Sequence, residues 1–313
     1  MKKLTLLFLL ALLLPLTASA IEVNKVNYIL DYSNNTAEVV GCDAELGSVT
    51  IPATVTDDEG YTYTVTGIGD NAFYGHSKIR TVELPNTIVS IGKSAFYKIE
   101  KLTYINIPNS VKSIGEKAFM DCGILSSVEV GRNSTLTSIG SSAFNGCSSL
   151  RSFNMPNSVE SIGASAFRYC STIRSINIPT SLTSIEAYAF HGCSGLTSVT
   201  IPNSVTSIGN SAFYNCSGLT SVSIPNSVTS IGESAFVNCS GLTSVSIPNS
   251  VTSIEYNTFY GCSSLNSVTI GDGVTSIGRS AFESCTTLAS LTIGSSVASI
   301  GEKAFYNARP LIR

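Results

Sequence analysis

The chain has little of what most enzymes and nucleic-acid-binding proteins use. It has 313 residues, no tryptophan, two histidines and 12% charged residues, against about 25% charged residues in a typical soluble protein. The net charge is −3, and no Lys/Arg run follows Lys2-Lys3. These features exclude a basic surface that would bind nucleic acid and a basic helix that would bind a membrane surface. His76 and His191 lie far apart, and no catalytic triad, metal-ligand spacing or phosphate loop is present. We therefore expect no enzyme activity, cofactor or metal site.

The first twenty residues have the pattern of a signal peptide. Lys2 and Lys3 form a positive start, Leu4–Leu16 is an apolar run too short to span a bilayer, and Ala18-Ser19-Ala20 fits a small-residue cleavage rule. A retained N-terminal anchor is the alternative to cleavage after Ala20. No later segment is apolar enough to span a membrane, so the sequence predicts a secreted or cell-surface protein without a transmembrane segment in its mature part.

Self-similarity dominates the rest of the chain. A Phe, nearly always preceded by Ala, recurs eleven times, at 73, 96, 119, 144, 167, 190, 213, 236, 259, 282 and 305. All intervals are 23 residues except that from Phe119 to Phe144, where two extra residues fall in the turn 131–134. Five residues before each Phe stands Ile, and six, nine and eleven residues after it stand further apolar residues. A fixed period of this kind is typical of a solenoid, in which stacked coils bury apolar faces that one coil cannot bury alone.

One coil shows the expected local structure. Residues 196–201 alternate apolar and hydroxyl side chains, as a half-buried strand does. Pro202 and Asn203 end that strand, and residues 205–208 form a second short extended stretch. Residues 210–216 should form a compact turn or a single helical turn that buries Phe213. The sequence thus predicts a β-rich, right-handed solenoid of about eleven 23-residue repeats over residues 68–313, with parallel strands on one side and short or helical turns on the other.

The repeat Leu-x-x-Val-x-Ile followed by Ile-Gly-x-x-Ala-Phe-x-x-Cys closely resembles the BspA-like branch of leucine-rich repeats over residues 68–311. The resemblance implies a secreted or surface-exposed protein that functions in adhesion to host matrix or cell-surface components and in cell–cell aggregation. It supplies no catalytic residue and no cofactor. The larger members of the family carry an anchor after the repeats, and no such anchor is visible before Arg313.

Both ends of a solenoid expose apolar surface unless they are covered. Residues 21–67 are expected to form a β-rich N-terminal cap, with a hairpin around Asn34-Asn35 and an acidic turn at 57–60. Residues 308–313 begin a strand and stop. Either Pro310 and its flanking arginines keep that strand edge from pairing with another chain, or the C-terminal end self-associates.

Eight of the nine cysteines stand three residues after a repeat Phe, and Cys42 stands apart. Equivalent positions in stacked coils lie about 4.8 Å apart with parallel side chains, whereas a disulfide needs facing Cβ atoms about 3.8 Å apart. We therefore expect buried free thiols rather than disulfides or a metal ladder.

The outward positions of the strand lie seven, eight and ten residues after each Phe. From Thr197 onward they are nearly all hydroxyl residues, whereas the N-terminal coils carry diverse side chains there. The candidate ligand-binding face consists of Arg80, Glu83, Tyr104, Asn106, Glu129, Arg151, Asn154, Arg174 and Asn177. Arg and Tyr favour interface hot spots, so we expect this half of the face to bind an extracellular protein or glycan. The alternative is a solvated face on a structural spacer or self-associating element, which the near-identical coils at 196–250 favour.

A second group of aromatic side chains follows the repeat Phe residues: Tyr74, Tyr97, Tyr169, His191, Tyr214, Tyr260 and Tyr306. A Tyr beside a turn commonly covers a core edge and keeps its hydroxyl in water. For this group the sequence favours packing over binding.

Overall fold

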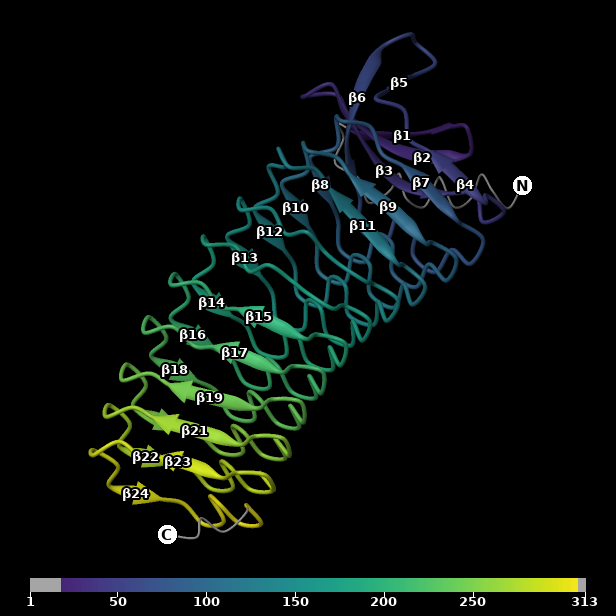
Figure 1. Cartoon of the computed structure of the whole chain (residues 1–313). Helices are drawn as coiled ribbons and strands as arrows, with labels where there is room; N and C mark the ends of the chain where they lie inside the picture. The colour runs from purple at the N-terminus through teal and green to yellow at the C-terminus, as the bar shows by residue number, and fades with distance from the viewer. Residues whose placement is uncertain (1–17, 309–313) are drawn as a thin grey trace.

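A computed structural model describes residues 18–308 as one elongated rod of stacked coils (Figure 1). The described part contains strands and turns but no helix. The predicted signal-peptide features at Lys2-Lys3 and Leu4–Leu16, and the predicted strand start at 309–313, lie outside the described residues.

One side of the rod carries the longer strand of each coil, and we call it the strand face. Its strands are β4 (Ser48–Thr50), β7 (Thr81–Glu83), β9 (Tyr104–Ile107), β11 (Ser127–Val130), β15 (Ser198–Thr200), β17 (Ser221–Ser223), β19 (Ser244–Ile247), β21 (Ser267–Ile270) and β23 (Ser290–Thr292). These strands pair in parallel in four groups, β4 with β7, β9 with β11, β15 with β17, and β19 with β21 and β23. Val128 lies opposite Ile105 and Val268 opposite Val245. Along each strand the apolar residues point inward and the residues that alternate with them point outward. This arrangement confirms the predicted parallel solenoid.

A second row of two-residue Ser-Ile strands lies where the chain turns away from the strand face. These strands are β8 (Ser90–Ile91), β10 (Ser113–Ile114), β12 (Ser138–Ile139), β13 (Ser161–Ile162), β14 (Ser184–Ile185), β16 (Ser207–Ile208), β18 (Ser230–Ile231), β20 (Ser253–Ile254), β22 (Ser276–Ile277) and β24 (Ser299–Ile300). Ile114 pairs with Ile139 even though 25 residues separate them. The two extra residues are therefore absorbed in the turn at 131–134 without a register shift.

The third side of each coil, the turn side, buries the repeat Phe. Each Phe ring stacks on the next, with ring centroids 4.9–5.8 Å apart from Phe73 to Phe305. The Phe amide donates to the carbonyl of the Ala in the next coil, as Phe213 does to Ala235 at 2.8 Å. The segment is a turn rather than a helical turn, because residues two before and two after the Phe adopt positive φ, such as Ser211 (54°) and Asn215 (56°).

The cysteines of the repeat complete the interior. Each of the eight thiols donates to the carbonyl of the Phe in the preceding coil at 3.0–3.3 Å, as Cys216 does to Phe190. All nine cysteines are free thiols. Burial raises the pKa of Cys193 to about 12, so these thiols remain protonated at neutral pH and pack as small apolar groups.

The N-terminal residues form a meander against the first coil (Figure 1). Strands β1 (Ala18–Val23), β2 (Val26–Asp31) and β3 (Thr36–Cys42) pair antiparallel, and β5 (Thr54–Thr56) pairs antiparallel with β6 (Thr62–Ile68). Strand β6 lies parallel between β3 and β8 and so joins the meander to the short-strand row. Strand β1 crosses the predicted cleavage site after Ala20, and Ile21–Val23 would retain their pairing with Val26–Tyr28 after cleavage.

The short-strand row is interrupted twice, between β13 and β14 and between β18 and β20. Four residues before the repeat Phe, nine of the eleven coils have Gly, and the two exceptions are Glu186 and Glu255. A Cβ added at Gly163 would lie 2.4 Å from the Ser141 nitrogen, so a side chain at this position cannot approach the preceding coil. The two glutamates follow directly after β14 and β20, where the ladder is broken. Their Cβ atoms explain these two interruptions, which we call the joints.

Replacing Glu186 by Gly is expected to close the first joint. Gly209 donates to Ile185 at 2.7 Å and Gly163 to Ile139 at 2.8 Å, whereas no equivalent bond joins Glu186 to Ile162 within residues 18–308. We expect the variant to gain about 1 kcal/mol in the free energy of unfolding from the restored backbone bonds. Hydrogen exchange of the amide of residue 186 should slow. Glu186→Ala is the matched control, because it removes the charge but keeps the Cβ; an equal gain there would refute the steric cause.

Candidate ligand-binding face

All nine predicted side chains are exposed on the strand face. They come from five successive coils: Arg80 and Glu83 lie at β7, Tyr104 and Asn106 at β9, Glu129 at β11, Arg151 and Asn154 beside Phe153, and Arg174 and Asn177 beside Ile176. Parallel register keeps equivalent positions in line, with Asn106 opposite Glu129. The structure therefore places the nine residues along one surface but not around one point.

Two of the predicted acidic residues accept hydrogen bonds from a neighbouring coil. The Tyr104 hydroxyl donates to the Glu129 carboxylate at 2.6 Å, and the Thr50 hydroxyl donates to Glu83 at 3.1 Å. The bond to Glu129 raises the pKa of Tyr104, so Tyr104 stays protonated and its ring is held over β11. In contrast, Arg80, Arg151 and Arg174 form no ion pair within residues 18–308.

The strand face changes character in the coils of Phe153 and Ile176. Regular strands give way to isolated bridges between Val128 and Phe153, Phe153 and Ile176, and Ser175 and Ser198. Phe153 stands in a column that other coils fill with Val, Ile or Leu, and its ring centroid lies 5.1 Å from that of Phe144 and 5.2 Å from that of Phe167. The isolated bridges thus lie beside the largest side chain of this column, and a packed interior has little free volume to accommodate a larger ring.

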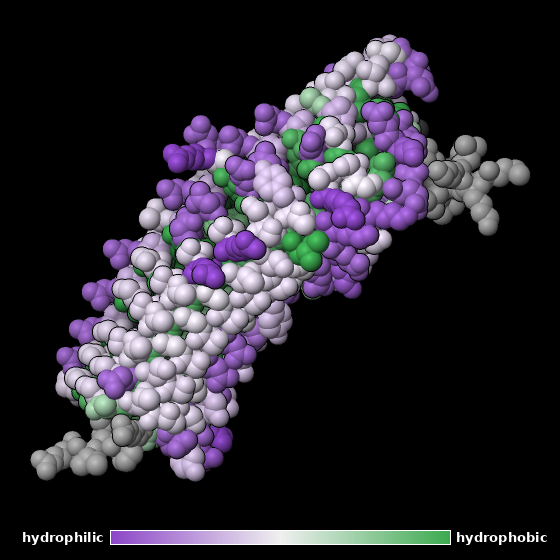
Figure 2. Space-filling model, turned by 45° about the vertical axis from the view of Figure 1, so that its right-hand side comes forward, coloured by the Kyte–Doolittle hydropathy of each residue, from purple (hydrophilic) through white to green (hydrophobic). Residues whose placement is uncertain are grey.

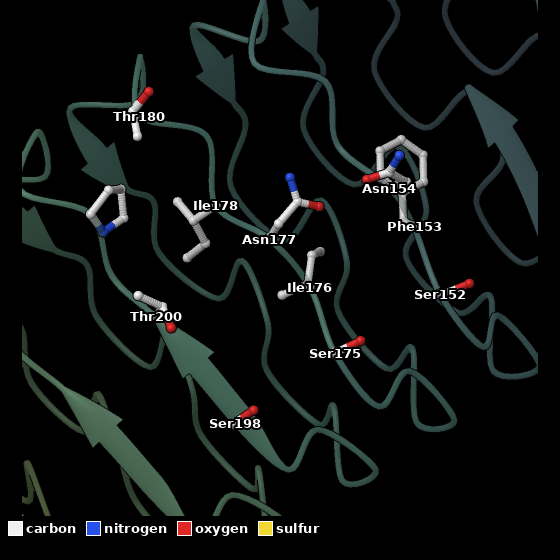
Figure 3. Close-up of a pocket in the computed structure, with 11 residues that line it drawn as sticks. Ser152, Phe153, Asn154, Ser175, Ile176, Asn177, Ile178, Thr180, Ser198 and Thr200 are labelled. Atoms are coloured by element: carbon white, nitrogen blue, oxygen red, sulfur yellow. The ribbon is translucent and has the colours of Figure 1, made fainter. Parts of the chain in front are cut away.

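A depression of about 490 Å³ lies on the strand face at this place (Figure 3). Buried Ile176 and Ile178 form its apolar floor, whereas Asn154, Asn177 and Thr200 supply amides and a hydroxyl. A second depression of about 230 Å³ adjoins it, and Asn154 and Asn177 line both. An apolar floor with a few polar groups is the usual composition of a binding site. Two of the nine predicted residues, Asn154 and Asn177, thus line these depressions.

The Asn177 side chain replaces part of the strand ladder. Its Oδ1 accepts from the Met155 amide at 3.0 Å, and its Nδ2 donates to the Met155 carbonyl at 2.6 Å. Both ends of the amide are therefore used in holding the two coils together. Asn154, by contrast, makes no side-chain hydrogen bond to the described part of the protein, which leaves its amide available to a ligand. Nothing in the sequence pattern distinguishes the two residues in this respect.

Beyond Thr197 the strand face becomes uniform. Its outward residues in β15, β17 and β19 are Ser or Thr, and several Thr side chains donate to the preceding coil, as Thr220 does to the Thr197 carbonyl at 3.1 Å. Figure 2 shows this as a pale surface over the C-terminal coils, whereas strongly hydrophilic side chains gather toward the N-terminal coils. The charged and aromatic side chains of this face thus lie in the coils before Ser198, and Asn266 is the one amide in an outward position of the described coils after it.

The two histidines take separate positions on the turn side. His76 lies 3.8 Å from the Cys42 sulfur, and burial with the nearby Asp43 charge raises the pKa of Cys42 to about 12, which disfavours a nucleophilic thiolate. His191 is buried, and its ring stacks 4.7 Å from the Tyr214 ring. Across residues 18–308 no group of three or more His, Cys, Asp or Glu side chains is arranged to hold a metal ion.

The parallel coils, the Phe ladder and the exposed strand face define a leucine-rich-repeat solenoid. The family described as "BspA type Leucine rich repeat region" matches residues 66–197 and 183–312, with six copies of the repeat. These matches cover more than half of the chain, which therefore belongs to this family. No curated protein matches the chain in sequence.

Three solved structures resemble the whole rod. A leucine-rich repeat protein from Bacteroides ovatus ATCC 8483 is 31% identical, with 92% of each chain covered and a TM-score of 0.60. A leucine rich cell surface protein from Faecalibacterium prausnitzii A2-165 is 29% identical over 92% of this chain and 80% of that one, with a TM-score of 0.61. The pneumococcal vaccine antigen PcpA shares the fold at 22% identity, with 93% and 86% coverage and a TM-score of 0.61.

No helix among residues 18–308 is both long enough and apolar enough to cross a membrane.

Proposed function

We propose that this chain is an exported, non-enzymatic repeat protein whose strand face binds an extracellular protein or glycan in adhesion or cell–cell interaction. Residues 1–20 would serve as the signal peptide, and residues 21–67 would cap a solenoid that starts at residue 68. The described relative from Faecalibacterium prausnitzii is a cell surface protein, which supports a surface or secreted location. The ligand would be a component of a host matrix or a cell surface.

The observation that carries this proposal is the contrast along the strand face. Three arginines and one tyrosine, Arg80, Tyr104, Arg151 and Arg174, are exposed before Ser198, and the uniform Ser/Thr coils follow. A surface that only had to be soluble would not need Arg and Tyr in these columns, since the C-terminal coils do without them. The depressions at Asn154 and Asn177 give this half of the face a shape as well as charge.

The spacer alternative rests on the C-terminal coils. Their outward residues repeat with little change, and a uniform surface offers a partner few distinctive groups. We assign these coils the task of extending the rod, which combines both ideas in one molecule. A self-associating element would instead use the C-terminal end.

The strand face can be tested by giving the N-terminal coils the outward residues of the C-terminal ones. The variant Arg80→Thr, Tyr104→Ser, Arg151→Thr and Arg174→Thr copies the columns that hold Thr197 and Ser198. We expect the parent protein to bind at least one component on an array of matrix proteins and glycans. The variant should bind it at least roughly a thousandfold more weakly, because two hot-spot residues at about 2 kcal/mol each already contribute about 4 kcal/mol.

The control is a variant with Thr220→Arg and Thr243→Arg in the C-terminal coils, which should leave binding unchanged. Circular dichroism must show the same fold in all three proteins. Unchanged binding by the fourfold variant would reject the strand face as the site, and a parent protein that binds no component would favour the spacer.

A further inference from the structure

A cluster of aromatic and cationic side chains lies on the turn side, in the coils of Phe167 and Phe190. The Arg168 guanidinium carbon lies 4.7 Å from the Tyr169 ring centroid and 5.6 Å from that of Tyr188. Its Nη2 donates to the Tyr169 hydroxyl at 3.0 Å. Two tyrosines therefore hold one arginine in a fixed orientation. Tyr169 is 46% exposed and Tyr188 is 40% exposed, so the cluster faces solvent.

Both tyrosines occupy backbone positions that disfavour bulky residues. Tyr169 and Tyr188 each have φ of 59°, in the left-handed region that costs about 1–2 kcal/mol for a residue with a Cβ. The coils that follow have Gly192 and Asn215 in the Tyr169 column, and Ser211 follows Tyr188 in its own column. Gly and Asn tolerate this backbone better than Tyr does. The same two columns have positive φ in the other coils, for example at Lys98 and Lys117, so this backbone conformation belongs to the repeat. What is particular to this place is that both columns carry an exposed tyrosine beside one arginine.

The charge of Arg168 has no acidic partner within residues 18–308. Its Nε is buried and has no hydrogen-bond partner. Burial, together with the Arg168 charge, lowers the pKa of neighbouring His191 to about 4, so His191 is neutral at pH 7. A partly buried arginine without a carboxylate, held between two rings, is ready to accept an anion.

A groove of about 520 Å³ begins at this cluster and follows the rod axis. Tyr169 lines one end and Gly261 the other, and the Asn215 and Asn238 amides lie between them. Ser hydroxyls one coil apart complete the lining, at 194, 217 and 240. The lining holds no charged residue and no aliphatic side chain. A peptide would usually need pockets for apolar anchors, whereas closely spaced hydroxyls and amides suit the hydroxyl groups of a sugar chain.

We propose that the turn side carries a second binding site, separate from the strand face, for an oligosaccharide that bears a carboxylate. The carboxylate pairs with the Arg168 guanidinium, and the adjoining sugar packs beside Tyr169 and Tyr188. The neutral remainder of the chain lies along the groove and exchanges hydrogen bonds with Asn215, Asn238 and the serines. The carboxylate can belong to a terminal sialic acid or to a uronic acid within a linear chain.

The experiment is calorimetric titration of the full chain with four probes. Sialyllactose and a hyaluronan octasaccharide carry carboxylates from the two sources, and lactose and a chitin-derived oligosaccharide are neutral counterparts. We expect at least one carboxylate probe to bind more tightly than its neutral counterpart, and the one that binds identifies the source. Binding of neither carboxylate probe, or equal binding of the neutral counterpart, overturns the proposal.

Variants copied from neighbouring coils keep the fold while removing the site. Arg168→Asn reproduces Asn145 of the preceding coil, Tyr169→Asn reproduces Asn215, and Tyr188→Ser reproduces Ser211. Arg168→Asn should weaken binding of the carboxylate probe roughly tenfold or more, as expected for loss of a charge-assisted hydrogen bond. Arg279→Asn, which reproduces Asn210 and removes an arginine outside both proposed sites, is the matched control and should bind as the parent does. Unchanged binding by Arg168→Asn rejects the site whatever the outcome on the strand face.

Discussion

Replacing Phe213 by Ala is expected to lower the free energy of unfolding by about 3–5 kcal/mol. Phe213 is fully buried, and its ring stacks 5.4 Å from Phe190 and 5.2 Å from Phe236. Removal of the ring leaves a cavity bordered by the two neighbouring coils. The backbone hydrogen bond from the Phe213 amide to the Ala235 carbonyl keeps the turn from collapsing into it. Urea unfolding followed by circular dichroism measures the loss.

The last ring of the ladder provides the control for this effect. Phe305 is only half-buried and stacks on Phe282 alone within the described residues. Phe305→Ala should therefore cost clearly less than Phe213→Ala. If the two substitutions had equal effects, the energy of the ladder would not come from rings enclosed on both sides, and the description of the core would be wrong.

The second large effect is expected at the small-residue column of the short-strand row. Gly163→Ala places a Cβ 2.4 Å from the Ser141 nitrogen and 2.7 Å from the Ser141 Cα. Backbone atoms cannot move aside as a flexible side chain can, so the coils must separate. We expect a loss of about 1–3 kcal/mol in the free energy of unfolding and faster hydrogen exchange at the amide of residue 163, which donates to Ile139.

Gly123→Ala is the matched control for Gly163. The nearest atom to a Cβ at Gly123 is the Ser148 hydroxyl oxygen at 3.9 Å, which is ordinary contact. This substitution should change stability by less than about 1 kcal/mol, because it only removes glycine's backbone freedom. A comparable loss at both sites would mean that the close approach of the coils does not set the cost.

The stacking of the coils could be predicted from the sequence because the columns keep a constant offset. The Ile, Phe, Cys and Leu columns stack in register, and the insertion before Phe144 falls in a turn as expected. The choice between a compact turn and a helical turn was left open. Gly or Asn at 75, 146, 192, 215, 238, 261 and 307 signals the left-handed backbone that decides it.

Neither the joints nor the depressions were predicted, although the joints correspond to a visible change in the sequence. Glu186 and Glu255 interrupt an otherwise constant Gly column, but the 2.4 Å approach that makes Gly necessary is visible only in three dimensions. Phe153 falls in the inward column nine residues after a repeat Phe, but how its ring packs against Phe144 and Phe167 is visible only in the structure. The two hydrogen bonds between the Asn177 side-chain amide and the Met155 backbone could not be predicted from the sequence.

The turn-side aromatic group shows a further limit of reasoning by columns. Tyr74 and Tyr97 stack 4.8 Å apart, in keeping with the packing role that the sequence favoured. Tyr188 was not included in the turn-side aromatic group, because it stands two residues before Phe190 and not after a repeat Phe. Only the fold brings Tyr188 and Tyr169 to the same arginine.

The two joints also determine how the molecule would respond to tension. Stacked coils hold together through contacts between neighbours alone, so a pull along the axis reaches every coil boundary with the same load. Within residues 18–308, the boundaries at Glu186 and Glu255 lack the backbone bonds that join the short strands on either side of them, so we expect the short-strand side to open there first. Opening at Glu186 would lengthen the protein and would also draw Tyr188 away from Arg168, because the two lie on opposite sides of that joint.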